Sequence, residues 1–330
     1  MLILTKAMLA LMIGFIISAI FGLLLVPVLK KLKANQKVSI FLQKKHKQKD
    51  GIPTMGGIIF IGATVLAILV LLLLNKIEMS YNLGLVLFVF ISYGVLGFID
   101  DYLIIKRHNN EGLTVIQKLV GQIIIAIIFF FIFMKGGNTP VVDIHTLGIK
   151  INLGWFYGFF ILLVLIATSN AVNLTDGLDG LAGGLSVIAF LTFGIIAWGS
   201  GWTTGNEDIG IFCFILVGSL LGFLLYNTHP AKVFMGDTGS LSLGAALASV
   251  AIITDHEITL LIVAGVFIIE TLTCIIQTVS MVLFRKKVFL MTPLHHHFEK
   301  KGWQETDIVK LFWTCGLLLS MIAITFGVWI

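Results

Sequence analysis

The sequence predicts an all-α, polytopic membrane protein with about ten transmembrane helices. Of its 330 residues, 58% are hydrophobic and only 12% are charged, and the mean hydropathy is +1.05. The hydrophobic residues gather in runs of about 20, the length that crosses a bilayer as a helix. Soluble domains do not have this composition. We therefore expect a protein that works within the membrane, and we expect no nucleic-acid partner.

Ten apolar runs can be placed along the chain. The first, residues 7–29, is longer than the core of a signal peptide and is followed by lysines, so we interpret it as a retained helix. Cys213, Cys274 and Cys315 lie inside apolar runs, which favours packing over a disulfide framework. Residues 1–330 are expected to form a single integral-membrane domain, with the other spans near 55–75, 83–99, 117–134, 154–169, 180–198, 209–226, 238–253, 258–284 and 307–329.

The basic residues predict the orientation of these spans, because Lys and Arg accumulate in cytoplasmic loops. If the N-terminus is outside, eighteen of the 22 basic residues fall in inner loops, and only Lys6, Lys76, Lys135 and Lys150 stay outside. Both termini are therefore predicted to be outside. The polar motifs then share the cytoplasmic face, which predicts one active site there, assembled from segments that are far apart in the chain.

Residues 170–184 form the most polar interruption of the apolar sequence. They place Asn170, Asn173, Asp176 and Asp179 between two runs that are apolar enough to lie in a bilayer. Because charge close to hydrocarbon is costly, a functional role is the default explanation. Carboxylate and amide oxygens suit Mg²⁺ or a sugar phosphate, and the neighbouring glycines allow close approach of the backbone. The alternative is a re-entrant turn whose polar groups satisfy one another.

Two further acidic motifs are expected on the same face. Asp100 and Asp101 end the third span, and adjacent residues on a helix do not face one another, so one carboxylate could bind metal while the other accepts a proton. The alternative is a solvated pair at a helix end. Asp237 lies where the eighth span begins, a position that attracts phosphate, with Mg²⁺ as the natural bridge. A simple helix cap by Thr238 or Ser240 is the competing interpretation.

Residues 293–299 contain His295, His296 and His297 in succession. Consecutive side chains diverge, so the three histidines are poorly arranged to chelate one zinc ion. Hydrogen bonding to phosphate or proton transfer near neutral pH fits better. A solvated loop without a role is the alternative.

Residues 49–57 lead from the lysine-rich loop into the second span. Lys49 could neutralise phosphate and Thr54 could bond a nucleotide, although the lysine run is also typical of positive-inside charge on anionic lipid. Glu270 is a lone acid in the ninth apolar run, and we expect it to face the bundle interior or a wet groove.

The ordered motifs resemble the polyprenyl-phosphate sugar-1-phosphate transferase superfamily over essentially the whole chain. The Asp100-Asp101 pair, the Asn-x-x-Asn-x-x-Asp-Gly-x-Asp-Gly run from Asn170 and the Phe-Met-Gly-Asp-Thr-Gly-Ser run from Phe234 match motifs of that superfamily. The Gly-x-Pro-Thr-Met-Gly-Gly motif at 51–57 and the Pro-Leu-His-His-His-Phe-Glu motif at 293–299 resemble its phospho-N-acetylmuramoyl-pentapeptide-transferase branch in particular.

This resemblance implies a bacterial plasma-membrane enzyme that uses UDP-N-acetylmuramoyl-pentapeptide, undecaprenyl phosphate and Mg²⁺ and releases UMP. It also implies a homodimer in contact with membrane lipid, with its ninth helix broken. Asp237 would hold Mg²⁺, Asp100 and Asp101 would assist the lipid phosphate, and His295 and His296 would contact the diphosphate. The resemblance implies nucleotide binding by Lys49, Asn173, Asp176, Asp179 and Phe234. We also predict substrate binding by Thr54, Asn170, Asn227 and His297.

The chain departs from the family pattern at two positions. Ile52 stands where the family often has Thr, and Ile104 stands where it often has Lys. Lys106 and Arg107 are the candidates for the charge that is missing at Ile104. The absence of this lysine weakens the prediction that the loop after Asp101 binds phosphate.

Simple chemistry supports such a transfer. A phosphomonoester is largely dianionic at pH 7, so the lipid phosphate needs charge neutralisation and alignment more than a base. Direct attack and a two-step route through an aspartyl-phosphate both fit, and we favour direct attack. The nearest alternative is a transferase that uses UDP-N-acetylglucosamine, against which the histidine motif argues. A transporter would place charges across the bilayer, whereas only Glu270 lies deep, and a scaffold would leave the acidic motifs unexplained.

Overall fold

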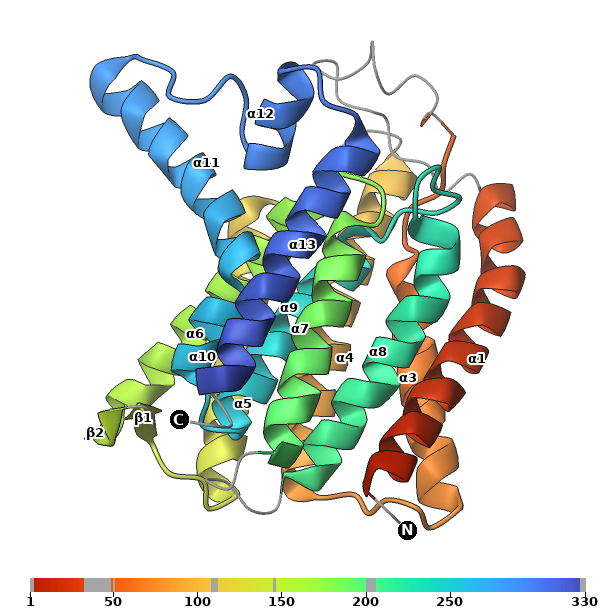
Figure 1. Ribbon diagram of the computed structural model, residues 1–330, viewed down its shortest axis with the longest axis vertical. Coiled ribbons are helices and arrows are strands. Elements are labelled where there is room, and N and C mark those ends of the chain that lie inside the picture. The colour runs from red at the N-terminus through yellow and green to blue at the C-terminus, as the bar shows by residue number, and fades with distance from the viewer. Residues whose placement is uncertain are drawn as a thin grey trace.

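The computed structural model describes residues 3–32, 49, 51–107, 112–144, 147–199 and 206–326. In these residues the chain is a bundle of roughly parallel and antiparallel helices (Figure 1). The long elements are α1 (Ile3–Lys31), α3 (Gly57–Leu73), α4 (Tyr81–Arg107), α5 (Val115–Lys135), α6 (Phe156–Thr175), α7 (Leu181–Gly199), α8 (Glu207–Asn227), α9 (Gly236–Ile253), α11 (Gly265–Phe284) and α13 (Glu305–Ile324), and the short ones are α10 (Glu257–Val263) and α12 (Leu294–Lys300).

The predicted all-α membrane architecture is confirmed. Within the described ranges, nine helices are long and apolar enough to cross a membrane, and α3 is a shorter apolar helix of 17 residues. The ninth apolar run is broken at Ala264 into α10 and α11, as the family resemblance implied. The third span is longer than predicted, because α4 continues to Arg107. Asp100 and Asp101 therefore lie within α4 rather than at its end.

Glycines allow the closest helix contacts in the bundle. A Cβ atom at Gly218 of α8 would collide with the carbonyl oxygen of Leu11 on α1, and one at Gly222 would lie 2.7 Å from that of Phe15. On the other side of the bundle, a Cβ at Gly97 of α4 would collide with the backbone of Asp237 on α9. The close packing of α4 on α9 brings together two acidic motifs that lie far apart in the sequence.

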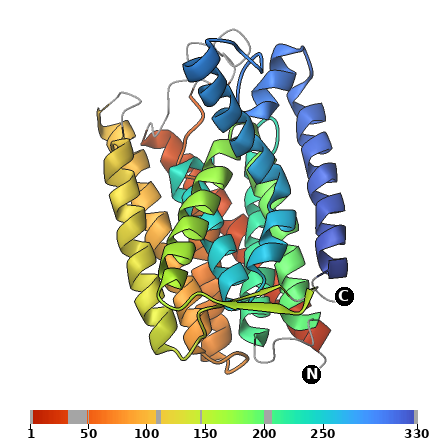
Figure 2. The same cartoon turned by 90° about the vertical axis from the view of Figure 1, so that its left-hand side faces the viewer.

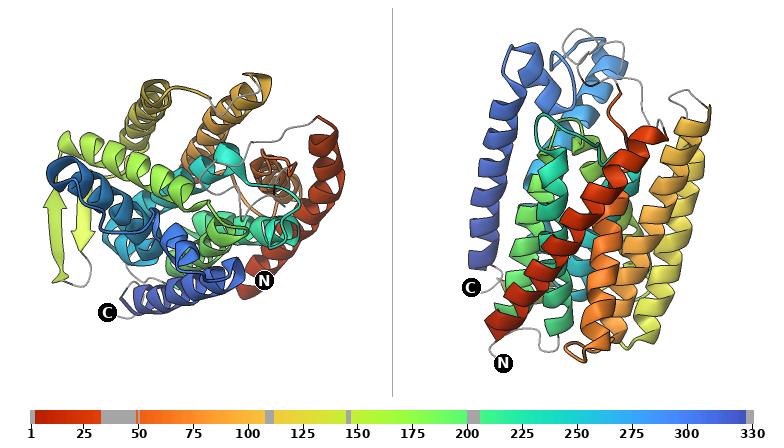
Figure 3. Two further views of the ribbon diagram at one scale, coloured as in Figure 1. Left: turned by 90° about the horizontal axis from the view of Figure 1, so that it is seen from above. Right: turned by 90° about the vertical axis from the view of Figure 1, so that its right-hand side faces the viewer.

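The two ends of the bundle differ in content. The N-terminal end of α1 and the C-terminal end of α13 lie at the lower end in Figure 1, whereas α12 lies at the upper end (Figures 1 and 3). A short antiparallel hairpin of β1 (Val141–Ile144) and β2 (Ile149–Asn152) lies near the lower end, at the edge of the bundle (Figure 2). The segments that carry the predicted site motifs are at the upper end, opposite the hairpin.

Helix α11 leans away from the rest of the bundle at the upper end, with α12 between it and α13 (Figure 1). Its last turn is highly exposed: the fractional exposures of Val282, Leu283 and Phe284 are 73%, 67% and 66%. Apolar side chains exposed to this degree are expected where a helix faces lipid.

Candidate active site

Two helices and the loop after a third bring carboxylates together at the upper end of the bundle. This group, called the acidic cluster below, consists of Asp100 and Asp101 on α4, Asp176 directly after α6, and Asp237 in the first turn of α9. Asn173 of α6 joins it, because its side-chain amide donates to Asp237 Oδ1 at 2.8 Å and to Ser240 Oγ at 2.9 Å. Three predicted motifs therefore meet in space, as expected for one site.

In the described part of the chain, Lys118 on α5 is the cation that contacts the acidic cluster. Its Nζ atom donates to Asp237 Oδ2 and lies 3.3 Å from Asp100 Oδ1. Sequence reasoning treated Lys118 only as one of many inner-loop charges and looked to Lys106 or Arg107 for the missing basic group. The side chain of Arg107 instead donates to the carbonyl oxygen of Gly112 at 3.0 Å. The available signal was that Lys118 is one helical turn into a span, where an unpaired charge would be costly.

Asp101 caps helix α9 from a different helix. Its Oδ1 atom accepts the backbone N–H of Asp237 at 3.2 Å, and its Oδ2 atom accepts the N–H and hydroxyl of Thr238 at 3.0 and 2.6 Å. Neither Thr238 nor Ser240 caps the helix, so that alternative is replaced by a cap from α4. Both oxygens of Asp101 are thus engaged in holding α9, whereas Asp100 is turned toward Lys118.

Asp100 is also held by the loop before α5. Its Oδ1 atom accepts the backbone N–H of Leu113 at 2.8 Å. Asp100 and Asp101 are only 3% and 1% exposed. The adjacent aspartates therefore have different partners, in agreement with the prediction that neighbours on a helix do not share a role.

A second group, called the Lys49 cluster, lies next to the acidic one. Lys49 Nζ donates to Asp179 Oδ1 at 2.6 Å and to Glu305 Oε1, in the first turn of α13, at 2.7 Å. His229 Nδ1 lies 3.0 Å from Asp179 Oδ2. The amino group of Lys49 also lies 5.9 Å from the ring centroid of Phe234. Glu305 was not singled out from the sequence, where it resembles an ordinary acid in a first helical turn.

The two clusters meet at the loop after α6, and their carboxylates respond differently. Burial raises the pKa of Asp176 to about 7, and the negative charges of Asp237, Asp101 and Asp179 contribute to this rise. Asp179, three residues later, is also desolvated, but the charge of Lys49 and the hydrogen bonds from Lys49, Ala231 and His229 outweigh that effect and lower its pKa. Lys49 therefore contacts Asp179 directly, whereas burial and neighbouring carboxylates outweigh its effect on Asp176.

Asp179, His229 and Glu305 also have the composition of a metal site. Each offers one ligand atom within 4.8 Å of the others. Lys49 Nζ already contacts both carboxylates, however, so an ammonium group fills the position that a cation would take. Among the described residues, the acidic cluster has more carboxylates around its lysine than the Lys49 cluster has.

The Gly-x-Pro-Thr-Met-Gly-Gly motif acts as a backbone partner for the segment before α9. Phe234 N–H donates to the carbonyl oxygen of Pro53 at 2.8 Å, and Gly56 N–H donates back to that of Phe234 at 2.8 Å. This pairing fixes the backbone that carries Phe234 beside Lys49. Thr54 is fully buried, with its hydroxyl beneath Gly236, and within the described part of the chain it has no hydrogen-bond partner.

The three histidines lie on α12 and have three different partners. His295 Nδ1 lies 3.2 Å from Glu270 Oε2, and His296 Nδ1 lies 2.6 Å from Glu299 Oε2. His297 Nδ1 accepts the backbone N–H of Leu290 at 3.1 Å. The hydrogen-bond partners differ, but the rings of His295 and His296 are in edge contact with centroids 4.2 Å apart, so the prediction that consecutive side chains diverge is wrong for this pair.

Two predicted binding residues contact other parts of the protein. Asn170 donates to Gln122 Oε1 at 3.1 Å and to the carbonyl oxygen of Ile166 at 2.8 Å. Asn227 is 2% exposed and donates to the carbonyl oxygen of Val233 at 3.0 Å. In the structure these asparagines hold the elements around the site, Asn227 by supporting the segment that carries Phe234.

The geometry defines a membrane-embedded protein with a site rich in carboxylates at one end of its helices. In agreement, the sequence pattern of glycosyl transferase family 4 matches residues 83–255, which contain the whole acidic cluster. The chain belongs to this family.

Proteins of similar sequence show which branch of the family the chain belongs to. The chain is 47% identical to a phospho-N-acetylmuramoyl-pentapeptide-transferase of Geobacillus sp. (strain WCH70), over 98% of each chain. It is 45% identical to the protein of that name from Halalkalibacterium halodurans, over 98% of each, and 44% identical to that from Bacillus subtilis (strain 168), over 97% of each. These matches place it among the phospho-N-acetylmuramoyl-pentapeptide-transferases, and with its membrane spans they make it a multi-pass plasma-membrane protein.

Proposed function

We propose that the protein transfers phospho-N-acetylmuramoyl-pentapeptide from its UDP-linked donor to undecaprenyl phosphate and releases UMP. The observation that carries this proposal is the convergence of Asp100, Lys118 and Asp237 from three helices into one charged centre. Phosphoryl transfer needs little covalent chemistry from a protein and depends on positioning and charge, which such a centre supplies. The names of the relatives supply the substrate class.

Mg²⁺ fits the acidic cluster. The cluster offers carboxylate and amide oxygens, which are the ligands that this hard cation prefers. The ammonium group of Lys118 lies between Asp100 and Asp237 and marks the place where positive charge is stabilised. Asp237, with Asp100 beside it, would hold the ion. When bound there, Mg²⁺ would neutralise charge on the transferred phosphoryl group.

Asp101, Lys118 and Asp100 would hold the site in place and position the substrate phosphates. Asp101 holds the first turn of α9, so that the backbone and carboxylate of Asp237 stay in place. Lys118 supplies a positive charge for phosphate oxygens. Because the lipid phosphate is already largely dianionic at neutral pH, Asp100 has to orient it more than to deprotonate it. This arrangement supports direct attack by the lipid phosphate.

The Lys49 cluster suits the nucleoside end of the donor. The ammonium group of Lys49 contacts both Asp179 and Glu305, so it already neutralises part of the charge that would attract a metal. The ring of Phe234 is available for stacking with uracil, and the amino group of Lys49 lies 5.9 Å from its centroid. The diphosphate would then lie between this cluster and the acidic one, at the loop that carries Asp176.

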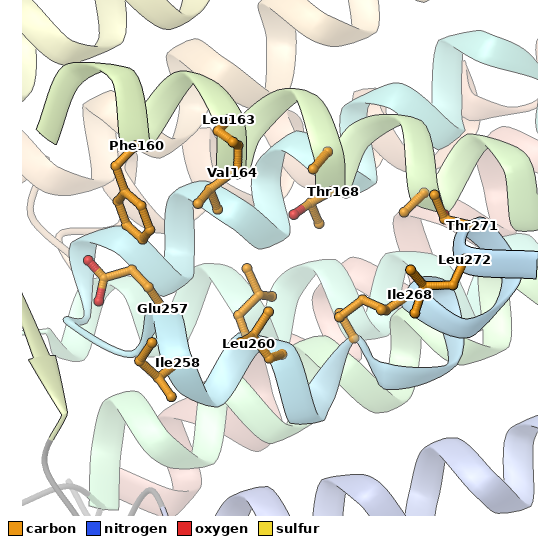
Figure 4. A pocket seen from close by; sticks show the side chains of 14 residues that line it. Phe160, Leu163, Val164, Thr168, Glu257, Ile258, Leu260, Ile268, Thr271 and Leu272 are labelled. Carbon is orange, nitrogen blue, oxygen red and sulfur yellow. The ribbon is translucent and has the colours of Figure 1, made fainter. Parts of the chain in front are cut away.

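An apolar groove offers a place for the lipid chain. It lies between α6 and the broken pair α10 and α11, with a volume of about 260 Å³ (Figure 4). Along α6 it extends from Phe160 to Ala171, about 16 Å at the rise of a helix. Ala171 is two residues before Asn173, so the groove ends close to the acidic cluster. A polyprenyl chain in the groove would bring its phosphate to that end.

The proposal is tested by UMP release from purified protein with undecaprenyl phosphate and Mg²⁺. Release with UDP-N-acetylmuramoyl-pentapeptide and its loss on chelation are expected. Release only with UDP-N-acetylglucosamine would contradict the assigned donor, and release with neither would contradict the transferase proposal. The homodimer implied by the family resemblance is part of the proposal, and light scattering of the purified protein measures it.

A further inference from the structure

Glu270 and His295 form a buried pair that the proposed reaction does not yet use. Glu270, on α11, and His295, on α12, are both 0% exposed. The backbone N–H of His295 lies 3.2 and 3.4 Å from the two oxygens of Glu270, and its Nδ1 atom lies 3.2 Å from Oε2. A carboxylate buried in this way is costly unless it is hydrogen-bonded. The three contacts from His295 meet this need and fix the position of the Glu270 carboxylate relative to the histidine ring.

The other ring nitrogen of His295 has a different environment. Its Nε2 atom is buried and has no hydrogen-bond partner in the described part of the chain. It faces Gly177, because a Cβ atom at Gly177 would collide with it. Gly177 directly follows Asp176, at the junction of the acidic and Lys49 clusters. An unpaired buried nitrogen pointing at this junction indicates a place for a ligand group.

We infer that Glu270 is a positioning residue, which holds Nδ1 of His295 so that Nε2 is presented to the diphosphate of the donor at Gly177. The inference rests on the proposed function. A carboxylate can only accept, so it fixes the proton of a neutral imidazole on Nδ1 and selects Nε2 as the nitrogen that meets the substrate. The same logic governs metal-bound histidines, whose outer carboxylate sets the tautomer and the ring orientation.

The position of Glu270 also links this histidine to the lipid groove. Ile268, Thr271 and Leu272, its neighbours on α11, line the groove between α6 and α11. One helix therefore carries a wall of the groove and the residue that orients His295. Glycine at 177 keeps this nitrogen accessible, since a side chain there would occupy the space in front of Nε2 of His295.

The test compares Glu270→Leu and Glu270→Gln with wild type in the full-length protein, using UMP release. Leu removes the acceptor, and we expect kcat to fall about 10- to 100-fold with a smaller change in the KM of the UDP-linked donor. Gln retains an acceptor oxygen and should retain more activity. Asp208→Asn, a carboxylate change on α8 at the opposite end of the bundle, is the matched control and should leave kcat unchanged.

A double-mutant cycle separates positioning from general damage. If Glu270 acts through His295, then adding Glu270→Leu to His295→Ala should cost less than about 2-fold. Equal losses in both backgrounds, or wild-type kcat in Glu270→Leu, would overturn the inference. Wild-type protein that releases no UMP would instead contradict the proposed function.

Nitrogen NMR of histidine-labelled protein gives a readout that is independent of activity. The chain has eight histidines, and the signals of His295 are those that His295→Ala removes. We expect a proton on Nδ1 of His295 in wild type and in Glu270→Gln, and a changed tautomer in Glu270→Leu if that variant folds. Signals of His295 that are identical in all three proteins, or a wild-type ring without a proton on Nδ1, would overturn the inference.

Discussion

The acidic cluster and the Lys49 cluster are each built around one lysine but differ in the number of carboxylates around it. In each, one lysine lies between two carboxylates from distant segments: Lys118 between Asp100 and Asp237, and Lys49 between Asp179 and Glu305. The acidic cluster adds two more carboxylates, and the Lys49 cluster adds a histidine. Ligand geometry alone would favour a metal in the second cluster, but the charge balance favours it in the first.

The carboxylates at the border of the two clusters report this difference. Asp176 and Asp179 lie in one short loop, yet burial and neighbouring carboxylates raise the pKa of Asp176 while Lys49 lowers that of Asp179. The number of acids near a site is therefore a poor guide to its ligand. What matters is how many of their charges the protein itself has already neutralised.

The largest expected effect is that of Asp237→Asn compared with Glu305→Gln. Asp237→Asn removes one negative charge from the acidic cluster and should lower Mg²⁺-dependent kcat at least about 100-fold in a folded protein. Glu305→Gln removes one charge from the Lys49 cluster and should leave the Mg²⁺ requirement unchanged. Titration of UMP release with Mg²⁺ measures both. A shifted Mg²⁺ requirement in Glu305→Gln alone would reverse the comparison.

Lys49→Met sharpens the assignment of the second cluster. If this cluster binds the nucleoside, the change should raise the KM for the UDP-linked donor about 10-fold, or about 1.4 kcal/mol, with a smaller effect on kcat. The measurement is steady-state UMP release over a range of donor concentrations. A fall in kcat as large as that in Asp237→Asn would instead place Lys49 with the chemical centre.

His296→Ala tests whether the site extends beyond both clusters to α12. We expect a loss of about 10-fold in turnover, within the range for proton-transfer or positioning groups near a reacting phosphate. Lys31→Ala, which changes an exposed basic residue at the end of α1, is the control and should change turnover by less than about 2-fold. Similar losses in both variants would return the histidines to the interpretation as a loop without a role.

The smallest expected effect concerns stability and pH. Asp176 has a pKa of about 7 in the folded protein, above its usual value of 3.8. Folding therefore favours the protonated form, and the stability that this provides is lost as the pH rises through about 7. In metal-free buffer, Asp176→Asn should unfold on the order of 2–4 °C above wild type at pH 8, and the gain should shrink toward pH 5.

Asp179→Asn is the matched control for that experiment and should have the opposite sign. The pKa of Asp179 is lowered from 3.8, so its charged form stabilises the fold above that pH, and Asn should lower the unfolding temperature at pH 7. Thermal unfolding at pH 5, 6, 7 and 8 with chelator measures both variants. Curves for Asp176→Asn and Asp179→Asn that run parallel would show that the two carboxylates do not differ as described.

Much of the fold was predictable, because hydrophobic runs and basic loops are local signals. The ten apolar runs at the predicted positions are helices in the structure, and the break in the ninth was implied by the family motifs. The boundaries were less accurate where polar residues continue a helix. Asp100 and Asp101 looked like a helix end, but α4 continues beyond them because Lys118 and the N-terminus of α9 provide partners for the two carboxylates.

The site was predictable in its acids and amides and less so in their partners. Asp100, Asn173 and Asp237 were recognised because polar side chains of this kind are rare in apolar sequence. Lys118 and Glu305 were missed, because a lysine or glutamate near a helix end is common and nothing local shows what it faces. Their roles come from contacts between segments far apart in the sequence: Lys118 with Asp237, and Glu305 with Lys49.

The sequence by itself determined the membrane architecture and the kind of chemistry, because the cost of burying charge in hydrocarbon restricts where acids can be placed. Only the tertiary structure decided which acid meets which cation or donor. Asp101 became a cap for α9, Asp179 became the partner of Lys49, and Glu270 became the partner of His295. These pairings depend on helix packing, in which glycines such as Gly97 and Gly177 leave the space that lets distant segments meet.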